Sequence, residues 1–167
     1  MLILLDIDGV MLPANSWKKP EFMEDGFPTF NLRSVNALQR ILSETNATIV
    51  LTTSHKTKYN VAKWKSLLKS RGINPKGVQR LKSNSLETSR KDEILNWFNK
   101  QLVPNEEFVI IDDDKMLNGL PSNLKGNLVL TSPSIGLTED LADEAISILK
   151  KRSLKYLDIT RPLLIIS

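Results

Sequence analysis

The chain has 167 residues, of which 41% are apolar and 25% charged, values that are typical of one ordinary globular domain. Chains of this length bury roughly 70% of their unfolded surface, so a core can form without metal or disulfide cross-links. Cysteine is absent, which excludes a disulfide framework, thiolate zinc sites and cysteine nucleophiles, and fits a reducing compartment such as the cytoplasm. The net charge of +4 is a mild excess that is compatible with a polyanionic partner but decides little.

The sequence shows no pattern of a membrane or targeting segment. No apolar run approaches the roughly 20 residues that a membrane span requires. The opening run Leu2–Leu5 is stopped by Asp6, too early for a signal peptide. We therefore expect a soluble, unprocessed cytoplasmic protein.

Apolar runs of strand length alternate with amphipathic segments of helix length, a pattern that predicts β-α units around a parallel sheet. Strands are expected at Leu2–Leu5, Ala47–Leu51, Val78–Leu81, Phe108–Ile111 and Asn127–Leu130. Helices are expected from the capping residue Asn31 to the Thr45-Asn46 break, and over about 58–70, 89–101 and 138–151. The apolar tail through Ile159 and Leu163 to Ile166 is suited to an edge strand or a short helix.

Residues 9–31 do not fit this alternation. Pro13, Pro20, Gly26 and Pro28 break the segment, which is long for a plain connection. Loops of this kind are usually functional or mobile. Because the chain shows no internal repeat, low-complexity tract or linker, we expect residues 1–167 to form a single domain.

Two carboxylates follow the first expected strand, in the sequence Asp6-Ile-Asp8-Gly9. In an open α/β sheet, ligands bind at the carboxyl ends of the strands. The two-residue spacing turns both side chains to one side, and Gly9 allows a sharp change of direction. Such a pair can share a divalent cation, or act as nucleophile and proton donor. The alternative is a polar strand end with two solvated aspartates.

A second acidic cluster, Asp112-Asp113-Asp114, follows the strand Phe108–Ile111. Like charges packed together are unfavourable unless a cation neutralises them, so the cluster indicates a metal site. An acidic loop in water is the alternative interpretation.

Two further segments have the chemistry to bind anions. The strand Ala47–Leu51 runs into Thr52-Thr53-Ser54-His55, whose hydroxyls and backbone N–H groups suit phosphate oxygens, although an ordinary helix cap has the same composition. Arg90 and Lys91 stand at the start of a helix, where a cation opposes the macrodipole. They are either solvated there by chance or directed at an anion.

The order of these four groups resembles the motifs of the haloacid dehalogenase (HAD) superfamily of phosphotransferases. The motifs correspond to Asp6 with Asp8, Thr53, Lys91 or Arg90, and Asp112 with Asp113. The segments Ser89–Trp97, Val109–Asp114 and Leu128–Thr138 are also similar to the phosphatase-like HAD domains associated with RNA repair proteins. The resemblance implies a three-layer α/β/α sandwich with a mostly parallel, Rossmann-like sheet.

The resemblance also implies a role for each motif. Asp6 would attack phosphorus and form an aspartyl-phosphate, while Asp8 would protonate the leaving oxygen and later activate water. Thr53 and Lys91 or Arg90 would bind the phosphoryl oxygens. Mg²⁺ would be held by the Asp6 carboxylate, the Asp8 backbone carbonyl and Asp113, with Asp112 as an adjacent ligand or a support.

Neither the stretch between the first two motifs nor Ser54–Arg90 has room for a cap domain, so we expect an open site that accepts large substrates. Trp17, Lys18, Lys19 and Phe22 could close over it and contact a base and phosphates, or the two aromatic residues could simply pack on the sheet. His55 is interpreted either as a substrate contact or as a satisfied residue at a helix start. Trp64 and Trp97 are expected in the core.

The sequence therefore predicts a Mg²⁺-dependent phosphomonoesterase for nucleotide or polynucleotide phosphate ends. The alternative is a non-catalytic binding or regulatory module that keeps the HAD fold and uses its basic surface. The intact set of aspartates favours the enzyme.

Overall fold

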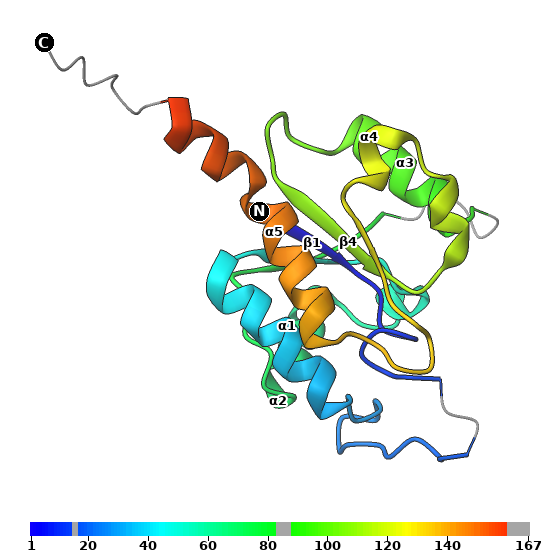
Figure 1. Cartoon of the computed structure of the whole chain (residues 1–167). Helices are drawn as coiled ribbons and strands as arrows, with labels where there is room; N and C mark the ends of the chain where they lie inside the picture. Colours follow the sequence, from blue (N-terminus) through cyan, green and yellow to red (C-terminus); the bar gives the residue numbers. More distant parts are fainter. Residues whose placement is uncertain (15–16, 83–87, 160–167) are drawn as a thin grey trace, which may run out of the picture.

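A five-stranded parallel sheet forms the centre of the fold (Figure 1). The structure, a computed structural model, describes residues 1–14, 17–82 and 88–159, with the backbone alone for residues 152–159. The strands of the sheet are β1 (Leu2–Leu5), β2 (Thr48–Leu51), β3 (Val78–Arg80), β4 (Phe108–Asp112) and β5 (Leu128–Leu130). Their order is β3-β2-β1-β4-β5, so β1 lies in the middle, between β2 and β4.

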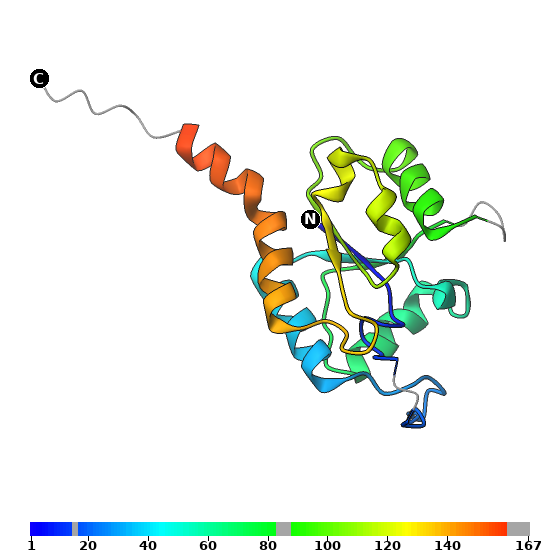
Figure 2. The ribbon, with the colours of Figure 1, turned by 45° about the vertical axis from the view of Figure 1, so that its right-hand side comes forward.

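Helices cover both faces of the sheet, which makes the three-layer α/β/α sandwich that the HAD resemblance implies. One face packs on α1 (Leu32–Thr45), α2 (Val61–Ser70) and α5 (Glu139–Ile159). The other packs on α3 (Arg90–Lys100), α4 (Ser122–Lys125) and the 3-10 helix η2 (Lys115–Gly119). Figures 1 and 2 show α1 and α5 side by side, with α3 and α4 across the sheet from them.

The alternation of strand side chains explains the two layers. Ile3 and Leu5 of β1 belong to the core shared with α1, α2 and α5, whereas Leu4 belongs to the core shared with α3 and α4. All three side chains are fully buried. Trp64 and Trp97 are also buried, one in each layer, as the sequence predicts.

The start of α1 agrees with the capping residue Asn31 that the sequence predicts, and Ser89, for which no capping role was predicted, caps α3 in the same way. The side chains of Asn31 and Ser89 accept hydrogen bonds from the backbone N–H groups of Ser34 and Asp92, and so cap α1 and α3. The prediction of a helix from residue 58 was wrong at its start, because Ser54–Thr57 form the 3-10 helix η1 and Asn60 caps α2.

The segments after β4 and after α5 differ more from expectation. The loop between β4 and β5 contains η2 and α4, both too short to give a periodic signal. The final helix, expected over 138–151, continues to Ile159, the first part of the apolar tail. The rest of that tail, with Leu163 and Ile166, lies outside the described residues.

Residues 21–29 form a small hairpin within the irregular 9–31 segment. Phe22 and Pro28 pair as an antiparallel bridge, and the backbone N–H of Met23 donates to the Phe27 carbonyl at 3.0 Å. In the part of the chain that the structure describes, no cap domain interrupts the sheet, and no helix is long and apolar enough to cross a membrane.

Candidate active site

Polar side chains follow the three central strands at a common level of the sheet. The register aligns Leu5 of β1 with Leu51 of β2 and Ile111 of β4. One residue further along, this level holds three buried residues: Asp6, Thr52 and Asp112. Because the carboxyl ends of parallel strands lie at one edge of the sheet, these residues come together although they lie far apart in the sequence.

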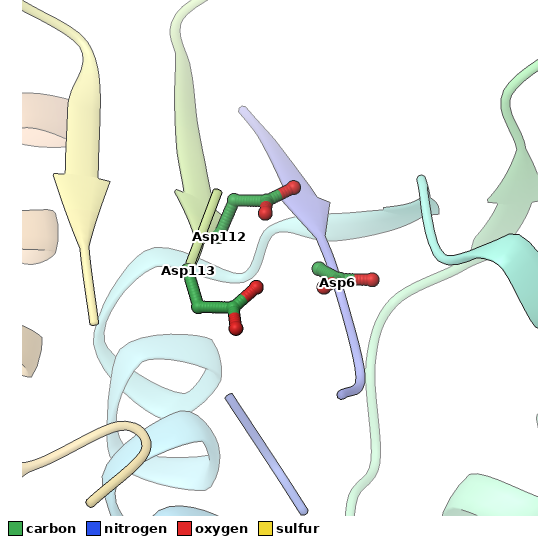
Figure 3. Close-up of side chains that lie close together, drawn as sticks. All are labelled: Asp6, Asp112 and Asp113. Atoms are coloured by element: carbon green, nitrogen blue, oxygen red, sulfur yellow. The ribbon is translucent and has the colours of Figure 1, made fainter. Parts of the chain in front are cut away.

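Three carboxylates meet at this edge, as Figure 3 shows. Asp6, Asp112 and Asp113 each offer one oxygen, and these oxygens lie within 4.8 Å of one another. Asp113 also reaches the loop after β1, where a Cβ atom at Gly9 would lie 2.1 Å from its Oδ2 atom. Gly9 has a φ of +73°, so both its conformation and the close approach of Asp113 require glycine.

Arg90 connects the carboxylates at the start of α3. Its Nη1 atom lies 2.8 Å from Asp112 Oδ2 and 3.3 Å from Asp6 Oδ1, and it donates to Thr52 Oγ1 at 3.2 Å. Asp6 is two residues after Leu4, whose side chain faces the α3 layer, so the guanidinium approaches from the side to which Asp6 points. The ammonium of the neighbouring Lys91 instead lies against Gly119 of η2.

A buried ion pair between Lys56 and Glu93 lies next to Arg90. Lys56 Nζ donates to the two carboxylate oxygens of Glu93 at 3.2 and 3.3 Å, and Glu93 Oε2 lies 3.8 Å from Arg90 Nε. Sequence reasoning missed this pair and the contact of Thr52 with Arg90. The helical spacing of Arg90 and Glu93, three residues apart, was a usable signal, whereas nothing local identifies Lys56.

Asp8 lies beside the cluster of Asp6, Asp112 and Asp113, and its carboxylate contacts His55. Its Oδ2 atom is 2.9 Å from Nε2 of His55, and both side chains are partly exposed. His55 lies in η1, directly after Thr53, which is fully buried and accepts a hydrogen bond from the His55 backbone N–H through Oγ1 at 3.3 Å. The structure thus brings Thr53 and Asp8 to the same edge and adds His55 to them.

A cavity of about 640 Å³ opens between this edge and the 9–31 segment. Asp8, Gly9 and Asp113 line one end. The remaining lining includes Leu12, Pro13, Lys18, Lys19, Pro28, Thr29, Phe30 and Leu32. Trp17 and Phe22 are 94% and 65% exposed, so the structure excludes the alternative that they pack on the sheet.

The electrostatics of the carboxylates follow from their burial. Burial, together with the charge of Asp6, raises the pKa of Asp112 to about 7, although Arg90 opposes the shift. Burial likewise raises the pKa of Asp6 against the effect of Arg90, and burial with the Asp6 charge raises the pKa of Asp113. The single guanidinium therefore does not neutralise the cluster.

Comparison with known protein families finds a match over most of the chain. Residues 2–142 match the family model of the HAD domain in Swiss Army Knife RNA repair proteins, a span that includes all of the candidate site residues. The chain belongs to this family. No curated protein and no solved structure matches it. The match confirms the HAD resemblance and the narrower similarity to RNA repair domains, and it supports a phosphoesterase-like role for this HAD domain.

The residues of the cluster fit a divalent cation. Carboxylate oxygens are hard ligands suited to such ions, and a cation among them would relieve the repulsion that raises their pKa values. Both Asp112 oxygens already have partners, because Oδ2 faces Arg90 and Oδ1 accepts from the backbone N–H of Asp114 at 3.0 Å. Asp6 and Asp113 are therefore the more available ligands.

Proposed function

We propose that this chain is a Mg²⁺-dependent phosphomonoesterase that removes a terminal phosphate from nucleic-acid ends through an aspartyl-phosphate on Asp6. The observation that carries the proposal is the position of Asp6. Its buried carboxylate lies 3.3 Å from the guanidinium of Arg90 and shares the metal-suited cluster with Asp113. The carboxyl of Asp8, two residues along, lines the cavity that a leaving group would enter.

In the first half of the reaction, a carboxylate oxygen of Asp6 attacks phosphorus in line with the leaving group. The bond between phosphorus and the leaving oxygen breaks, and its electron pair stays on that oxygen. The carboxyl of Asp8 donates a proton to it, which prevents the expulsion of an alkoxide. In the second half, Asp8 takes a proton from water, and the hydroxide that results attacks phosphorus and frees Asp6.

The remaining residues hold the phosphoryl group and the metal. Arg90 is the cation that the geometry favours for the phosphoryl oxygens, with Thr53 supplying a hydroxyl. Asp6, the backbone carbonyl of Asp8 and Asp113 would hold Mg²⁺, with Asp112 as their support. When bound, Mg²⁺ supplies positive charge between the carboxylate of Asp6 and the phosphate dianion, which otherwise repel each other.

The substrate class follows from the cavity and from the family. The cavity begins at Asp8 and Asp113, extends to Lys18 and Lys19, and has an apolar wall that includes Phe30. A terminal nucleoside would find apolar surface there, and the next phosphate of the chain would meet the two lysines. The description of the family as an RNA repair domain supports a phosphorylated RNA end.

The first test is phosphate release from oligonucleotides with 3′ or 5′ phosphates, nucleotides, sugar phosphates and phosphopeptides, with Mg²⁺ or with EDTA. We expect turnover only with the metal. Asp6→Asn should abolish turnover, because an amide cannot form the acyl phosphate. Asp140→Asn, an exposed aspartate in the first turn of α5, is the matched control. Full activity in EDTA or in Asp6→Asn would reject the mechanism, and no hydrolysis at all would leave the binding-module alternative.

The second test concerns the size of the substrate. At low salt, a phosphorylated oligonucleotide should have a higher kcat/KM than the mononucleotide, and the advantage should shrink as salt rises because counterion release drives the added affinity. The Lys18→Ala/Lys19→Ala variant should lose the advantage. Lys65→Ala/Lys69→Ala removes the same charge from exposed positions on α2 that line no part of the cavity. Equal kcat/KM values for both substrates would reject the polynucleotide assignment.

A further inference from the structure

His55 holds one particular oxygen of the Asp8 carboxyl. The distance from Nε2 of the imidazole to Oδ2 of Asp8 is 2.9 Å, a hydrogen-bond distance. A carboxylic acid has one proton to give, and either oxygen can carry it. When the Nε2–H group donates to Oδ2, the proton of the acid resides on Oδ1, so this contact would determine which oxygen carries the proton.

One contact of the backbone and one of the ring restrict the position of His55. The backbone N–H of His55 donates to Thr53 Oγ1. The ring meets Phe27 edge-on, with 5.5 Å between the ring centroids and 87° between the ring planes. Phe27 also packs edge-on against Trp64, at 5.4 Å, so the face on which the histidine rests is anchored in the core.

Phe27 in turn belongs to hairpin 21–29, which Arg71 attaches to the end of α2. Arg71 donates to the Phe27 carbonyl at 2.8 Å and to both carboxylate oxygens of Asp25 at 2.6 and 3.0 Å. The hairpin that walls the cavity thus also supports the residue that contacts the acid. A substrate that enters the cavity meets an Asp8 carboxyl whose Oδ2 atom already contacts His55.

We propose that His55 is a positioning residue for general acid catalysis by Asp8, an inference that rests on the proposed phosphatase function. His55 donates a hydrogen bond from Nε2 to Oδ2 and gives up no proton. Oδ1 of Asp8 delivers its proton to the oxygen that leaves phosphorus, and that oxygen keeps the electron pair of the broken bond. Loss of His55 lets the Asp8 carboxyl rotate, which lowers the fraction of molecules in which the proton points at the leaving oxygen.

The hydrogen bond can be tested without any turnover, because His55 is the only histidine of the chain. In long-range ¹H–¹⁵N spectra, we expect the neutral imidazole to be the tautomer protonated on Nε2. Asp8→Ala should shift these signals, whereas the control Asp140→Ala should not. A neutral ring protonated on Nδ1 would overturn the proposal, because its Nε2 atom has no proton to donate.

The catalytic role is tested with two leaving groups. A dinitrophenolate leaves as a stable anion and needs no proton, whereas an alkoxide does. We expect His55→Ala to lower kcat/KM for an alkyl phosphate by about 10- to 100-fold more than for dinitrophenyl phosphate, a part of the roughly 10²–10⁴-fold that a general acid supplies. His55→Gln, which keeps an N–H donor near the Nε2 position, should recover most of the loss. Thr57→Ala, an exposed residue of the same turn, is the control.

A double-mutant cycle separates this role from direct binding of phosphate by His55. In an Asp8→Ala background, His55→Ala should have no further effect on the alkyl phosphate. Equal losses on both substrates, or a full additional loss in Asp8→Ala, would show that His55 acts on the phosphoryl group and overturn the proposal. Wild-type protein that hydrolyses neither substrate would instead reject the phosphatase function. Because the pair is partly exposed, all variants should keep the melting temperature of the wild type within a few degrees.

Discussion

Arg90 and Lys91 occupy consecutive positions of α3, so their side chains diverge by about 100° around the helix axis. The sequence predicted a phosphate-binding cation here but did not decide between Arg90 and Lys91, because the direction in which a helix face points depends on how the helix packs. The structure directs Arg90 toward Asp6 and Asp112 and Lys91 toward η2.

We expect Arg90→Ala to lower kcat/KM by about 10²–10³-fold, as loss of a group that stabilises transition-state charge does. Arg90→Lys should recover only part of this, because an ammonium cannot reproduce the geometry of a guanidinium that touches two carboxylates. Lys91→Ala is the matched control and should change kcat/KM by less than about threefold, since it removes no contact specific to the transition state. Steady-state kinetics check the series, and a more severe defect in Lys91→Ala would reverse the assignment.

Some of the other site residues could be found from the sequence, and others could not. Asp6, Asp112 and Asp113 could be found from the sequence, because each follows an apolar strand and the carboxyl ends of parallel strands share one edge. The contact between His55 and Asp8 could not, since it depends on the 3-10 turn after β2 and on a rotamer. The spacing of apolar residues predicts neither this 3-10 turn nor a side-chain rotamer.

At the scale of elements, the sequence predicted the helices whose position depends on local features, namely a capping side chain and an apolar face. Helices α1 and α3 have a capping side chain and an apolar face, and the sequence locates both. The 3-10 helices, α4 and hairpin 21–29 are too short for a period, and long-range contacts hold the hairpin in place. Among these contacts are the hydrogen bonds from the buried guanidinium of Arg71 to Asp25 and to the Phe27 carbonyl, which no local pattern in the sequence predicts.

The hairpin gives a prediction on stability. The hydrogen bond from Arg71 lowers the pKa of Asp25 to about 2. We expect Asp25→Asn to reduce the free energy of unfolding at neutral pH by about 1.5–3 kcal/mol, the range for a hydrogen bond to a charged group. Because the folded pKa is lowered, the contribution of Asp25 is complete above its ordinary pKa of 3.8 and is lost as the pH falls toward 2.

Urea unfolding of both proteins across this acid range checks the prediction. Glu24→Gln removes the neighbouring exposed carboxylate of the same hairpin and is the control. The difference between wild type and Asp25→Asn should narrow below the ordinary pKa. A constant difference at all pH values, or an equal loss in Glu24→Gln, would contradict the assigned role of the Arg71–Asp25 pair.

At the scale of the whole molecule, the fold concentrates buried negative charge at one edge of the sheet. Two cores, one on each side of the sheet, hold the central strands rigidly, so the carboxylates cannot separate to relieve their repulsion. The sequence indicated the cluster, but only burial explains its effect on stability. Asp6 and Asp112 are 5% and 1% exposed, and water therefore screens them poorly.

This arrangement predicts an unusual dependence of stability on pH in the absence of metal. The pKa of Asp112 is about 7 in the folded protein and 3.8 as a free side chain, so between these values the folded state binds a proton that the unfolded state has lost. Stability from this group is therefore present at the acid end and decreases as the pH rises through about 7, by roughly 2–4 kcal/mol. Mg²⁺ competes with the proton, so it should stabilise the protein far more at about pH 8 than at about pH 5.5.

Thermal unfolding at the two pH values, with EDTA or with millimolar Mg²⁺, measures both effects. Asp112→Asn removes the titrating group and should flatten the pH dependence in EDTA, whereas the exposed control Asp140→Asn should leave it unchanged. The difference between wild type and Asp112→Asn removes the contribution of groups that titrate independently of this carboxyl, and it reports Asp112 together with Asp6, whose charge raises the pKa of Asp112. If Mg²⁺ raises the melting temperature equally at both pH values, proton and metal do not compete, and the cluster of Asp6, Asp112 and Asp113 is not the metal site.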